Sequence, residues 1–209
     1  PEELTSQEFP TSFNFTSNSA PTAPDTSINL SGTEDTAITI TSAQLLAGWS
    51  DPNSDTLSVT ALSTNSSDGT LVDNNNGTWT FTPVANLNGE ISLSYSVSDG
   101  TNTTDATASM TLEAINDAPV LSGIPVELTN GPENTGYIIM AADLLKGFTD
   151  AEGDSLSITN LAATNGYLTN NNNGTWSFAP SRNFSGSVAL TYSVIDGNGG
   201  STDVQNSFT

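Results

Sequence analysis

The sequence repeats itself at an interval of just under 100 residues, and this repeat limits the folds that the chain can adopt. Glu34 recurs as Glu133, 99 residues later, whereas the tripeptide GTW at position 77 recurs 97 residues later. A deletion of two residues between positions 55 and 77 accounts for the change. A period of this length corresponds to a complete domain rather than to a solenoid repeat. The 209 residues therefore predict two homologous domains in tandem.

The composition excludes several classes of function. The chain contains no His and no Cys, which removes the commonest general base, the thiolate nucleophile and the ligands of soft metals. Lys146 and Arg182 are the only cations beside 23 carboxylates, so the formal charge is −21. Such a surface repels nucleic acid and anionic lipid. No stretch approaches 18 consecutive apolar residues, and we expect no membrane insertion.

Each repeat is typical of a small all-β domain. Ser, Thr and Asn dominate the polar residues, which favours strands and turns. Alternation in TLSVTAL and SLSITNL indicates half-buried strands, and SAQLLAG and AADLLKG each predict one helical turn. The sequences NNNGTW and NNNNGTW predict hairpins in which Asn-Gly forms a two-residue turn. About seven strands per repeat predict two tandem β-sandwiches.

The aromatic residues fit a core better than a binding platform. Trp79 and Phe81 share one face of a strand, and so do Trp176 and Phe178, so we expect all four to be buried rather than to stack on sugars. The Asn-Gly-Thr sequons at 76 and 173 are explained by the turns without a glycan.

The repeat also sets the expected boundaries. Residues 25–117 form the first domain and residues 118–209 the second. Within residues 1–24, SNSAP at 17–21 matches INDAP at 115–119, so these residues are interpreted as the last strand and linker of a preceding repeat or as a docked strand. On this interpretation the sequence is one piece of a longer array.

Acidic residues are concentrated in two short turns at equivalent positions. DPNSD contains Asp51 and Asp55, and DAEGD contains Asp150, Glu152 and Asp154. Two carboxylates about 4 Å apart repel by roughly 4 kcal/mol at an effective dielectric constant near 20, so a rigid cluster indicates a bound cation. Ca²⁺ fits because it prefers carboxylate, amide and carbonyl oxygens. Ordinary Asp- and Asn-rich loops without metal remain the alternative.

The ordered set of motifs resembles the bacterial cadherin-like tandem repeats of large RTX-type surface adhesins. The matching stretches are LLAG, DPNSDTLSV, NGTWTFTP, YSVSDG and NDAPV, and GPENTG and EAINDAPV are also similar to elements of cadherin repeats. The resemblance covers residues 25–209. It implies Greek-key, cadherin/Ig-like sandwiches whose neighbours are joined by Ca²⁺ at the linker.

The resemblance also implies two sets of calcium ligands. The first set lies around the linker between the domains: Glu34, Glu113, Asn116, Asp117, Asp150, Glu152, Asp154 and Asp196. The second set, Asp51, Asp55 and Asp99, would face residues 17–25, where Ser19 replaces the linker Asp. We therefore expect the second set to bind more weakly unless Asp25 compensates. Asp99 and Asp196 each precede Gly, so a role as simple turn-formers is equally open. Because the middle acidic element of vertebrate cadherins is absent, one or two ions per junction are expected.

These features predict a spacer rather than an enzyme. We expect a rigid, calcium-stabilised extender segment of a secreted bacterial surface adhesin, which serves cell adhesion or biofilm formation and has neighbouring repeats as its partners. No catalytic residue is assigned, because two equivalent acidic turns offer no unique cleft to a glycosidase. A module that binds surface glycans or proteins is one alternative. Homophilic adhesion through a strand containing Phe13 and Phe15 is the other.

Overall fold

Short strands joined by turns make up most of the chain, as the composition predicts. The structure is a computed structural model that describes residues 17–124 and 126–209. The chain divides into two units, Pro1–Ala114 (unit 1) and Ile115–Thr209 (unit 2), so that Asn116 and Asp117 belong to unit 2. Phe13 and Phe15, the strand considered for homophilic adhesion, lie outside the described residues.

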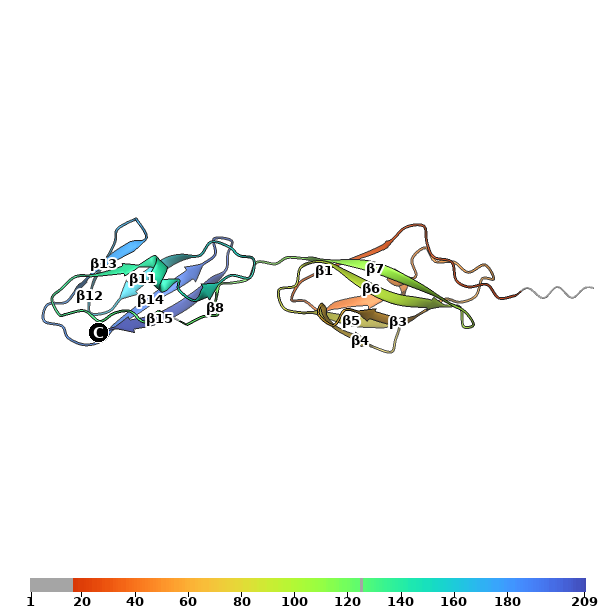
Figure 1. Cartoon of the computed structure of the whole chain (residues 1–209), viewed down its shortest axis with the longest axis horizontal. Coiled ribbons are helices and arrows are strands. Elements are labelled where there is room, and N and C mark those ends of the chain that lie inside the picture. The colour runs from red at the N-terminus through yellow and green to blue at the C-terminus, as the bar shows by residue number, and fades with distance from the viewer. Residues whose placement is uncertain (1–16, 125) are drawn as a thin grey trace, which may run out of the picture. The chain divides into compact units, whose positions relative to one another are not determined.

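Unit 1 is a sandwich of two antiparallel layers, with one parallel strand added at an edge. One sheet has the strand order β1-β7-β6-β3 and the other the order β2-β5-β4 (Figure 1). The chain crosses between the sheets after β1, β2, β3 and β5, whereas β4–β5 and β6–β7 pair within one sheet. This is the Greek-key arrangement that the resemblance implies. The elements are β1 (Ile28–Thr33), β2 (Ile38–Thr41), α1 (Ser42–Leu45), β3 (Ser58–Thr64), β4 (Gly69–Asp73), β5 (Thr78–Pro83), β6 (Gly89–Ser98) and β7 (Thr103–Glu113).

Unit 2 repeats this plan with one difference at the edge. Its sheets have the orders β11-β14-β15 and β12-β13-β9, and a short separate pair joins β8 to β10. Within the part of unit 2 that the structure describes, no strand pairs with β15 as β1 pairs with β7. The elements are β8 (Val120–Leu121), β9 (Tyr137–Met140), α2 (Ala141–Leu144), β10 (Phe148–Thr149), β11 (Ser157–Ala163), β12 (Gly166–Asn170), β13 (Thr175–Pro180), β14 (Val188–Ile195) and β15 (Ser201–Phe208).

The two cores consist of the residues that alternate inward along the strands. Trp79 and Phe81 of β5 are 7% and 0% exposed, and Trp176 and Phe178 of β13 are 9% and 2% exposed. These tryptophans are therefore core residues, as predicted, and offer no stacking surface to a sugar.

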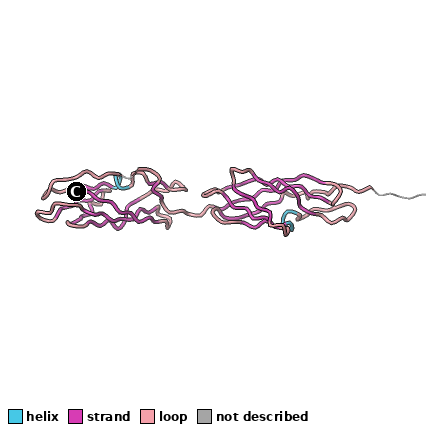
Figure 2. Tube along the Cα trace, turned by 90° about the horizontal axis from the view of Figure 1, so that it is seen from below, coloured by secondary structure: helices cyan, strands magenta, loops and turns pink. Residues whose placement is uncertain are grey.

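A buried tyrosine fixes the single helical turn of each unit. The hydroxyl group of Tyr95 donates to the carbonyl of Leu45 at 3.1 Å, and that of Tyr192 donates to the carbonyl of Leu144 at 3.2 Å. Figure 2 shows the short helices that these bonds hold. Each helical turn leads into an acidic turn, so the tyrosines help to position it. In the described part of the chain, no helix is long and apolar enough to span a membrane.

The two hairpins form where they are predicted, but their loops are longer than two residues. In unit 1 the left-handed residues are Asn75, with φ 57°, and Gly77, with φ 80°. The loop is closed by the N–H of Asn74, which donates to the carbonyl of Thr78 at 3.0 Å. Asn76 instead accepts the N–H of Thr78 through its side chain. The asparagines therefore support a longer loop because their side chains bond within the hairpin, Asn74 to the hydroxyl groups of Thr78 and Thr80 and Asn75 and Asn76 to backbone.

Residues 17–24 pack against unit 1 rather than extending away from it. Thr22 and Ser50 form an antiparallel bridge in which each N–H donates to the other residue's carbonyl, at 2.8 and 3.1 Å. The hydroxyl group of Thr104 donates to the carbonyl of Pro21 at 2.8 Å. This segment thus docks on the end of unit 1 that contains the DPNSD turn.

Candidate metal centre

The acidic turn of unit 2 is organised by one oxygen of Asp150. Its Oδ1 accepts the N–H groups of Glu152, at 3.1 Å, and of Asp154, at 3.0 Å. Gly153 takes a left-handed conformation with φ 78°, which closes the turn. As a result, carboxylate oxygens of Asp150, Glu152 and Asp154 lie within 4.8 Å of one another. At that distance each charged pair repels by about 3 kcal/mol at an effective dielectric constant near 20.

The second oxygen of Asp150 has no hydrogen-bond donor. Its Oδ2 is buried and makes no hydrogen bond within the protein. Burying a charged oxygen without a partner is costly, and a bound cation would remove that cost. The turn therefore meets one structural condition for a metal site, because a buried carboxylate oxygen has no hydrogen-bond donor in the protein.

The linker segment of unit 2 is hydrogen-bonded to the carboxylates at this end. The N–H of Asp117 donates to Oε2 of Glu152 at 3.1 Å, and Nδ2 of Asn116 donates to Oδ2 of Asp196 at 2.8 Å. The hydroxyl group of Thr202 donates to the carbonyl of Pro119. These bonds attach residues 116–119 to the end of unit 2 at which the acidic turn lies.

Asp196 anchors the loop between β14 and β15. It is 4% exposed, and its Oδ1 accepts the N–H groups of Asn198, Gly199 and Gly200 at 2.7, 3.0 and 3.1 Å. The amide of Asn116, together with these N–H groups, lowers the pKa of Asp196 below its usual value. Asp196 is therefore charged at neutral pH, and both of its oxygens are already hydrogen-bonded.

Unit 1 builds the same turn from a less acidic sequence. Oδ1 of Asp51 accepts the N–H groups of Asn53 and Asp55 at 2.7 and 3.1 Å, and its Oδ2 is buried without a hydrogen bond. Ser54 occupies the left-handed position, with φ 66°, that Gly153 occupies in unit 2. The arrangement of one satisfied and one unsatisfied aspartate oxygen thus occurs in both units.

The segment docked on unit 1 reproduces the linker contacts of unit 2. Nδ2 of Asn18 donates to Oδ2 of Asp99 at 3.0 Å, and the N–H of Ser19 donates to Oδ1 of Asn53 at 2.7 Å. The N–H of Asn102 donates to Oδ1 of Asp99 at 2.6 Å and is the main cause of the lowered pKa of Asp99. Asn18 and Ser19 therefore hold the positions of Asn116 and Asp117.

The two ends differ mainly in charge. The unit 2 end carries five carboxylates, whereas the unit 1 end carries three. Two substitutions account for the difference, because Ser19 stands where unit 2 has Asp117 and Asn53 stands where it has Glu152. Asn53 preserves the hydrogen bond to the docked segment without adding a charge.

The predicted ligands Glu34 and Glu113 lie together at the opposite end of unit 1. The N–H of Glu34 donates to the carbonyl of Glu113 at 3.0 Å. The Glu34 side chain is 0% exposed and accepts Nδ2 of Asn88 at 3.3 Å, whereas Glu113 is exposed. This pair meets through backbone, and the Glu113 side chain faces solvent.

Three further residues shape the acidic ends and were not identified from the sequence. Nδ2 of Asn198 donates to Oδ2 of Asp154 at 2.6 Å, and Asn102 bonds both Asp99 and Asn18. At Gly200, a Cβ atom would lie 2.7 Å from the carbonyl oxygen of Asp117 and would collide with Oδ2 of Asp196. All three lie within four residues after Asp99 or Asp196. This closeness to a predicted ligand is the sequence feature that could have identified them.

The chemistry of the cluster is that of a hard cation site. Its atoms are carboxylate oxygens, with amide side chains and backbone carbonyls beside them, and the sequence contains no His or Cys. Ca²⁺ accepts six to eight such oxygens in flexible geometry, whereas softer metals prefer nitrogen or sulfur.

Comparison with known proteins identifies the fold of both units. A family model described as a cadherin-like domain matches the chain twice, over residues 17–113 and 115–209. Human protocadherin-24 EC1-2 is 15% identical, with 92% of this chain and 98% of that chain covered and a TM-score of 0.56. No curated protein matches the chain.

Two other similar structures have TM-scores too low to support an argument. Drosophila N-cadherin EC1-4 is 12% identical, with 87% of this chain and 47% of that chain covered and a TM-score of 0.49. An endo-fucoidan hydrolase of glycoside hydrolase family 107 is 22% identical, with 96% and 30% covered and a TM-score of 0.36. The present chain thus spans less than a third of that hydrolase.

A methyl group at position 200 should detach the linker from unit 2. In Gly200→Ala the new Cβ would press on Asp196, Asp117 and Ala118. Loss of the hydrogen bond between Asp117 and Glu152 should speed amide exchange at residues 116–118 by about tenfold. Hydrogen exchange with mass spectrometry measures this rate, and Ser201→Ala, at the exposed neighbouring position, is the control. Equal amide exchange rates at residues 116–118 in both variants would show that docking of the linker does not depend on a glycine at position 200.

The lowered pKa of Asp196 should make its contribution to stability depend on pH. A group whose pKa is lower in the folded state stabilises the fold above its unfolded pKa, near 3.9, and loses this effect as pH falls through the folded value. In chelator, Asp196→Asn should therefore melt at a lower temperature than the parent at pH 7. The difference should shrink steadily below about pH 4. A difference that stays constant to pH 2 would contradict this assignment.

Proposed function

Because the chain belongs to the cadherin-like domain family, we propose that it is a calcium-stabilised extender segment of a large bacterial surface adhesin. Domains of this family are typically non-enzymatic adhesion modules that bind Ca²⁺ at their linkers. The finer points, namely a bacterial RTX-type parent protein, an extracellular position on the cell surface and a role in biofilms, rest on the sequence motifs described above.

One observation carries the calcium proposal. Oδ2 of Asp150 and Oδ2 of Asp51 are both buried without a hydrogen bond, at equivalent points of two different sequences. Each belongs to a turn in which the other oxygen is fully engaged by backbone N–H groups. Burying a carboxylate oxygen without a hydrogen bond costs free energy. Its presence in both repeats is expected where a bound ligand offsets that cost. A cation is the ligand that suits them best, because the lone pairs without a donor are those of carboxylates.

The residues that would hold Ca²⁺ in unit 2 surround the buried oxygen of Asp150. Asp150, Glu152 and Asp154 supply three carboxylates within 4.8 Å. The docked linker brings Asn116 and Asp117 to the same end of the unit through their bonds to Asp196 and Glu152. Asp196 would act mainly by positioning Asn116, and its remaining lone pairs would also be available to the ion.

Unit 1 would hold Ca²⁺ more weakly with Asp51, Asp55 and Asp99. This end has two carboxylates fewer than the unit 2 end, and affinity in such sites depends on the number of charged ligands. Residues 17–24 are already docked without an ion, because Nδ2 of Asn18 donates to the Asp99 carboxylate and the N–H of Ser19 donates to the amide oxygen of Asn53. The segment at this end would therefore keep its position at calcium concentrations that leave the weaker site empty.

The mechanism we propose is restraint of the linker by shared ligands. When it is bound, Ca²⁺ neutralises the carboxylates and gives oxygens from different segments a common charge centre. Without it, mutual repulsion among five carboxylates would favour release of residues 116–119 from the acidic turn. Glu34 and Glu113, from the resemblance, are proposed to contribute from unit 1, so that the ion would restrain the angle between the units.

The expected energies are sufficient for such a restraint. Extracellular calcium modules bind with dissociation constants of about 10⁻⁴–10⁻³ M. An ion at a hundred times its dissociation constant stabilises the bound form by about 2.7 kcal/mol per site. That free energy shifts a two-state equilibrium between a docked and a free linker by about a hundredfold.

Small-angle X-ray scattering tests the spacer role directly. We expect the distribution of distances in the parent chain to become narrower when millimolar Ca²⁺ replaces chelator. The double variant Asp117→Ala and Asp150→Ala should keep the broad distribution in both buffers, while circular dichroism shows that both domains remain folded. A profile of the parent chain that is identical with and without Ca²⁺ would contradict the proposal.

The matched control is a charge change outside the acidic ends. Asp203 lies on β15 and accepts the hydroxyl group of Ser193 at 2.7 Å, away from the turn. Asp203→Ala removes the same charge as one of the test substitutions and should respond to Ca²⁺ like the parent. A loss of the response in this variant would point to general charge screening instead of a specific site.

A further inference from the structure

A cavity of about 590 Å³ opens on the side of unit 2. It is lined by Leu121 and Val126, by the end of the helical turn α2 and by strands β14 and β15. Three of its lining residues, Leu144, Leu190 and Tyr192, belong to the core and are 1%, 0% and 4% exposed. The volume lies within the range of about 300–1,000 Å³ that is typical of sites for small ligands. The cavity is therefore large enough for an apolar ligand and reaches the core of the unit.

Unit 1 carries a larger side chain at the corresponding place. Trp49 stands there in the position of Phe148, which lines the cavity in unit 2. The ring centroids of Trp49 and Tyr95 are 6.4 Å apart, and Nε1 of Trp49 donates to the hydroxyl group of Tyr95 at 3.4 Å. Phe148 is smaller and has no N–H to donate. The substitution of Trp by Phe therefore leaves space beside Tyr192, the counterpart of Tyr95.

A second substitution keeps the neighbouring segment away from the sheet. Asn206 of β15 holds the register position that Ala108 holds in β7. The small Ala108 side chain allows parallel pairing with Ile28 of β1. In unit 2, Nδ2 of Asn206 instead donates to the carbonyl of Val126 at 3.3 Å. A side chain thus stands between Val126 and the strand, where unit 1 has direct backbone pairing.

The cavity has a single charged group among the described residues that line it, the ammonium group of Lys146. Unit 1 has Ala47 at this position, and the whole chain has only one other cation, Arg182. No ion pair joins Lys146 to a carboxylate in the part of the chain that the structure describes. Apolar walls with one ammonium group suit a ligand that has an aliphatic body and an anionic head.

Exposed apolar side chains adjoin the cavity. Leu121, which lines it, is 43% exposed, and Ile124 is 84% exposed. The backbone of Ile124 lies against Gly147, because a Cβ atom at Gly147 would be 2.9 Å from the carbonyl oxygen of Ile124. Gly147 stands between Lys146 and Phe148 in the sequence. Apolar surface therefore lies beside the ammonium group, and covering it with an aliphatic chain is favourable.

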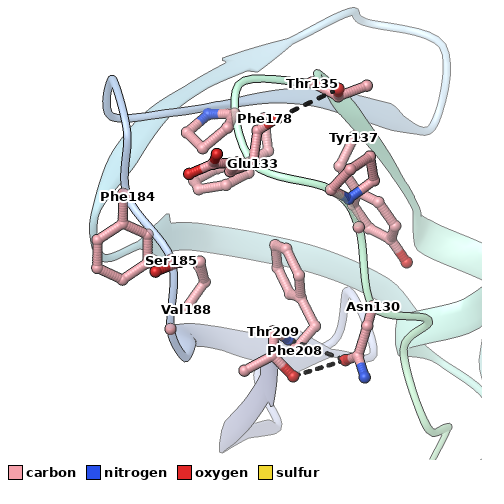
Figure 3. A pocket seen from close by; sticks show the side chains of 14 residues that line it. Asn130, Glu133, Thr135, Tyr137, Phe178, Phe184, Ser185, Val188, Phe208 and Thr209 are labelled. Carbon is pink, nitrogen blue, oxygen red and sulfur yellow. Dashed lines mark hydrogen bonds between the residues drawn. The ribbon is translucent and has the colours of Figure 1, made fainter.

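Another apolar cavity of unit 2 has the opposite charge. It has a volume of about 380 Å³, and Figure 3 shows Tyr137, Phe178 and Phe208 around it. Glu133 is the charged residue among those that line it. A carboxylate there repels an anionic head group, so the two cavities should differ in the ligands that they accept.

We propose that the cavity beside Lys146 binds a free fatty acid, with the alkyl chain against Phe148 and Tyr192 and the carboxylate paired with Nζ of Lys146. A free fatty acid carries one negative charge. An anionic bilayer carries many, and a chain of net charge −21 is repelled by such a surface. The ligand is therefore a single dispersed molecule rather than a membrane. The site lies within unit 2, and its use does not depend on calcium.

Calorimetric titration of the 209-residue chain with decanoate tests the proposal. The titration is made in chelator, which prevents calcium soaps, and below the concentration at which decanoate forms micelles. Lys146→Gln should weaken decanoate binding by roughly tenfold, because a charge-assisted bond is lost. Decanol has the same alkyl chain without the charge, so it should bind the parent more weakly than decanoate does and should bind Lys146→Gln as it binds the parent.

Two further variants separate the cavity from general effects. Phe148→Trp installs the residue of unit 1 and should weaken binding of decanoate and of decanol by at least tenfold, because the indole ring occupies the space. Arg182→Gln removes the other cation and should bind decanoate like the parent. Circular dichroism verifies that each variant is folded. The proposal is overturned if the parent binds no decanoate, or if folded Lys146→Gln or folded Phe148→Trp binds decanoate as tightly as the parent.

Discussion

Electrostatic repulsion among carboxylates at the ends of the sandwiches is the constraint on which the interpretation of this protein depends. A strand sandwich needs turns, and an aspartate that accepts two backbone N–H groups makes a tight one. In Asp51 and Asp150 this bond occupies one oxygen and directs the other into a buried position without a donor. We propose that the turn geometry thereby creates a cation ligand as a consequence of ordinary backbone bonding. Neighbouring carboxylates then add charge, which raises both the cost without an ion and the affinity for one.

The internal repeat supplies a comparison that a single domain cannot. Where the two units agree, as in the buried Asp oxygen and in the tyrosine that holds the helical turn, the feature belongs to the fold. Where they differ, single substitutions change the number of carboxylates at the acidic end. Asn53 keeps the hydrogen bond that Glu152 makes and omits its charge, and Ser19 omits the carboxylate of Asp117. Unit 1 thus docks its segment through one amide acceptor, Asn53, and one carboxylate acceptor, Asp99. In unit 2 both corresponding acceptors are carboxylates, Glu152 and Asp196.

Most of the fold was predictable because its signals are local. Alternating residues such as Trp79 and Phe81 predict a strand face, and the spacing of the repeat predicts two domains. The predicted length of the hairpin loops, two residues, was wrong. The N–H of Asn74 bonds to the carbonyl of Thr78 and the side chain of Asn76 accepts the N–H of Thr78, so the loop is longer. Composition does not reveal which asparagine takes the left-handed conformation. The acidic turns were recognised from charge alone. Asn198 and Gly200 were missed because their importance depends on contacts across the loop, with Asp154 and with Asp117, which spacing does not encode.

Calorimetric titration of the 209-residue chain with Ca²⁺ is the most direct test of the central claim. The account predicts at least two classes of site with dissociation constants at or below about 10⁻³ M. Asp150→Asn should remove the tighter class and Asp51→Asn the weaker one, because each substitution replaces the buried oxygen's charge. Absence of binding at millimolar Ca²⁺, or binding that survives both substitutions, would contradict the claim that these two aspartate oxygens are cation ligands.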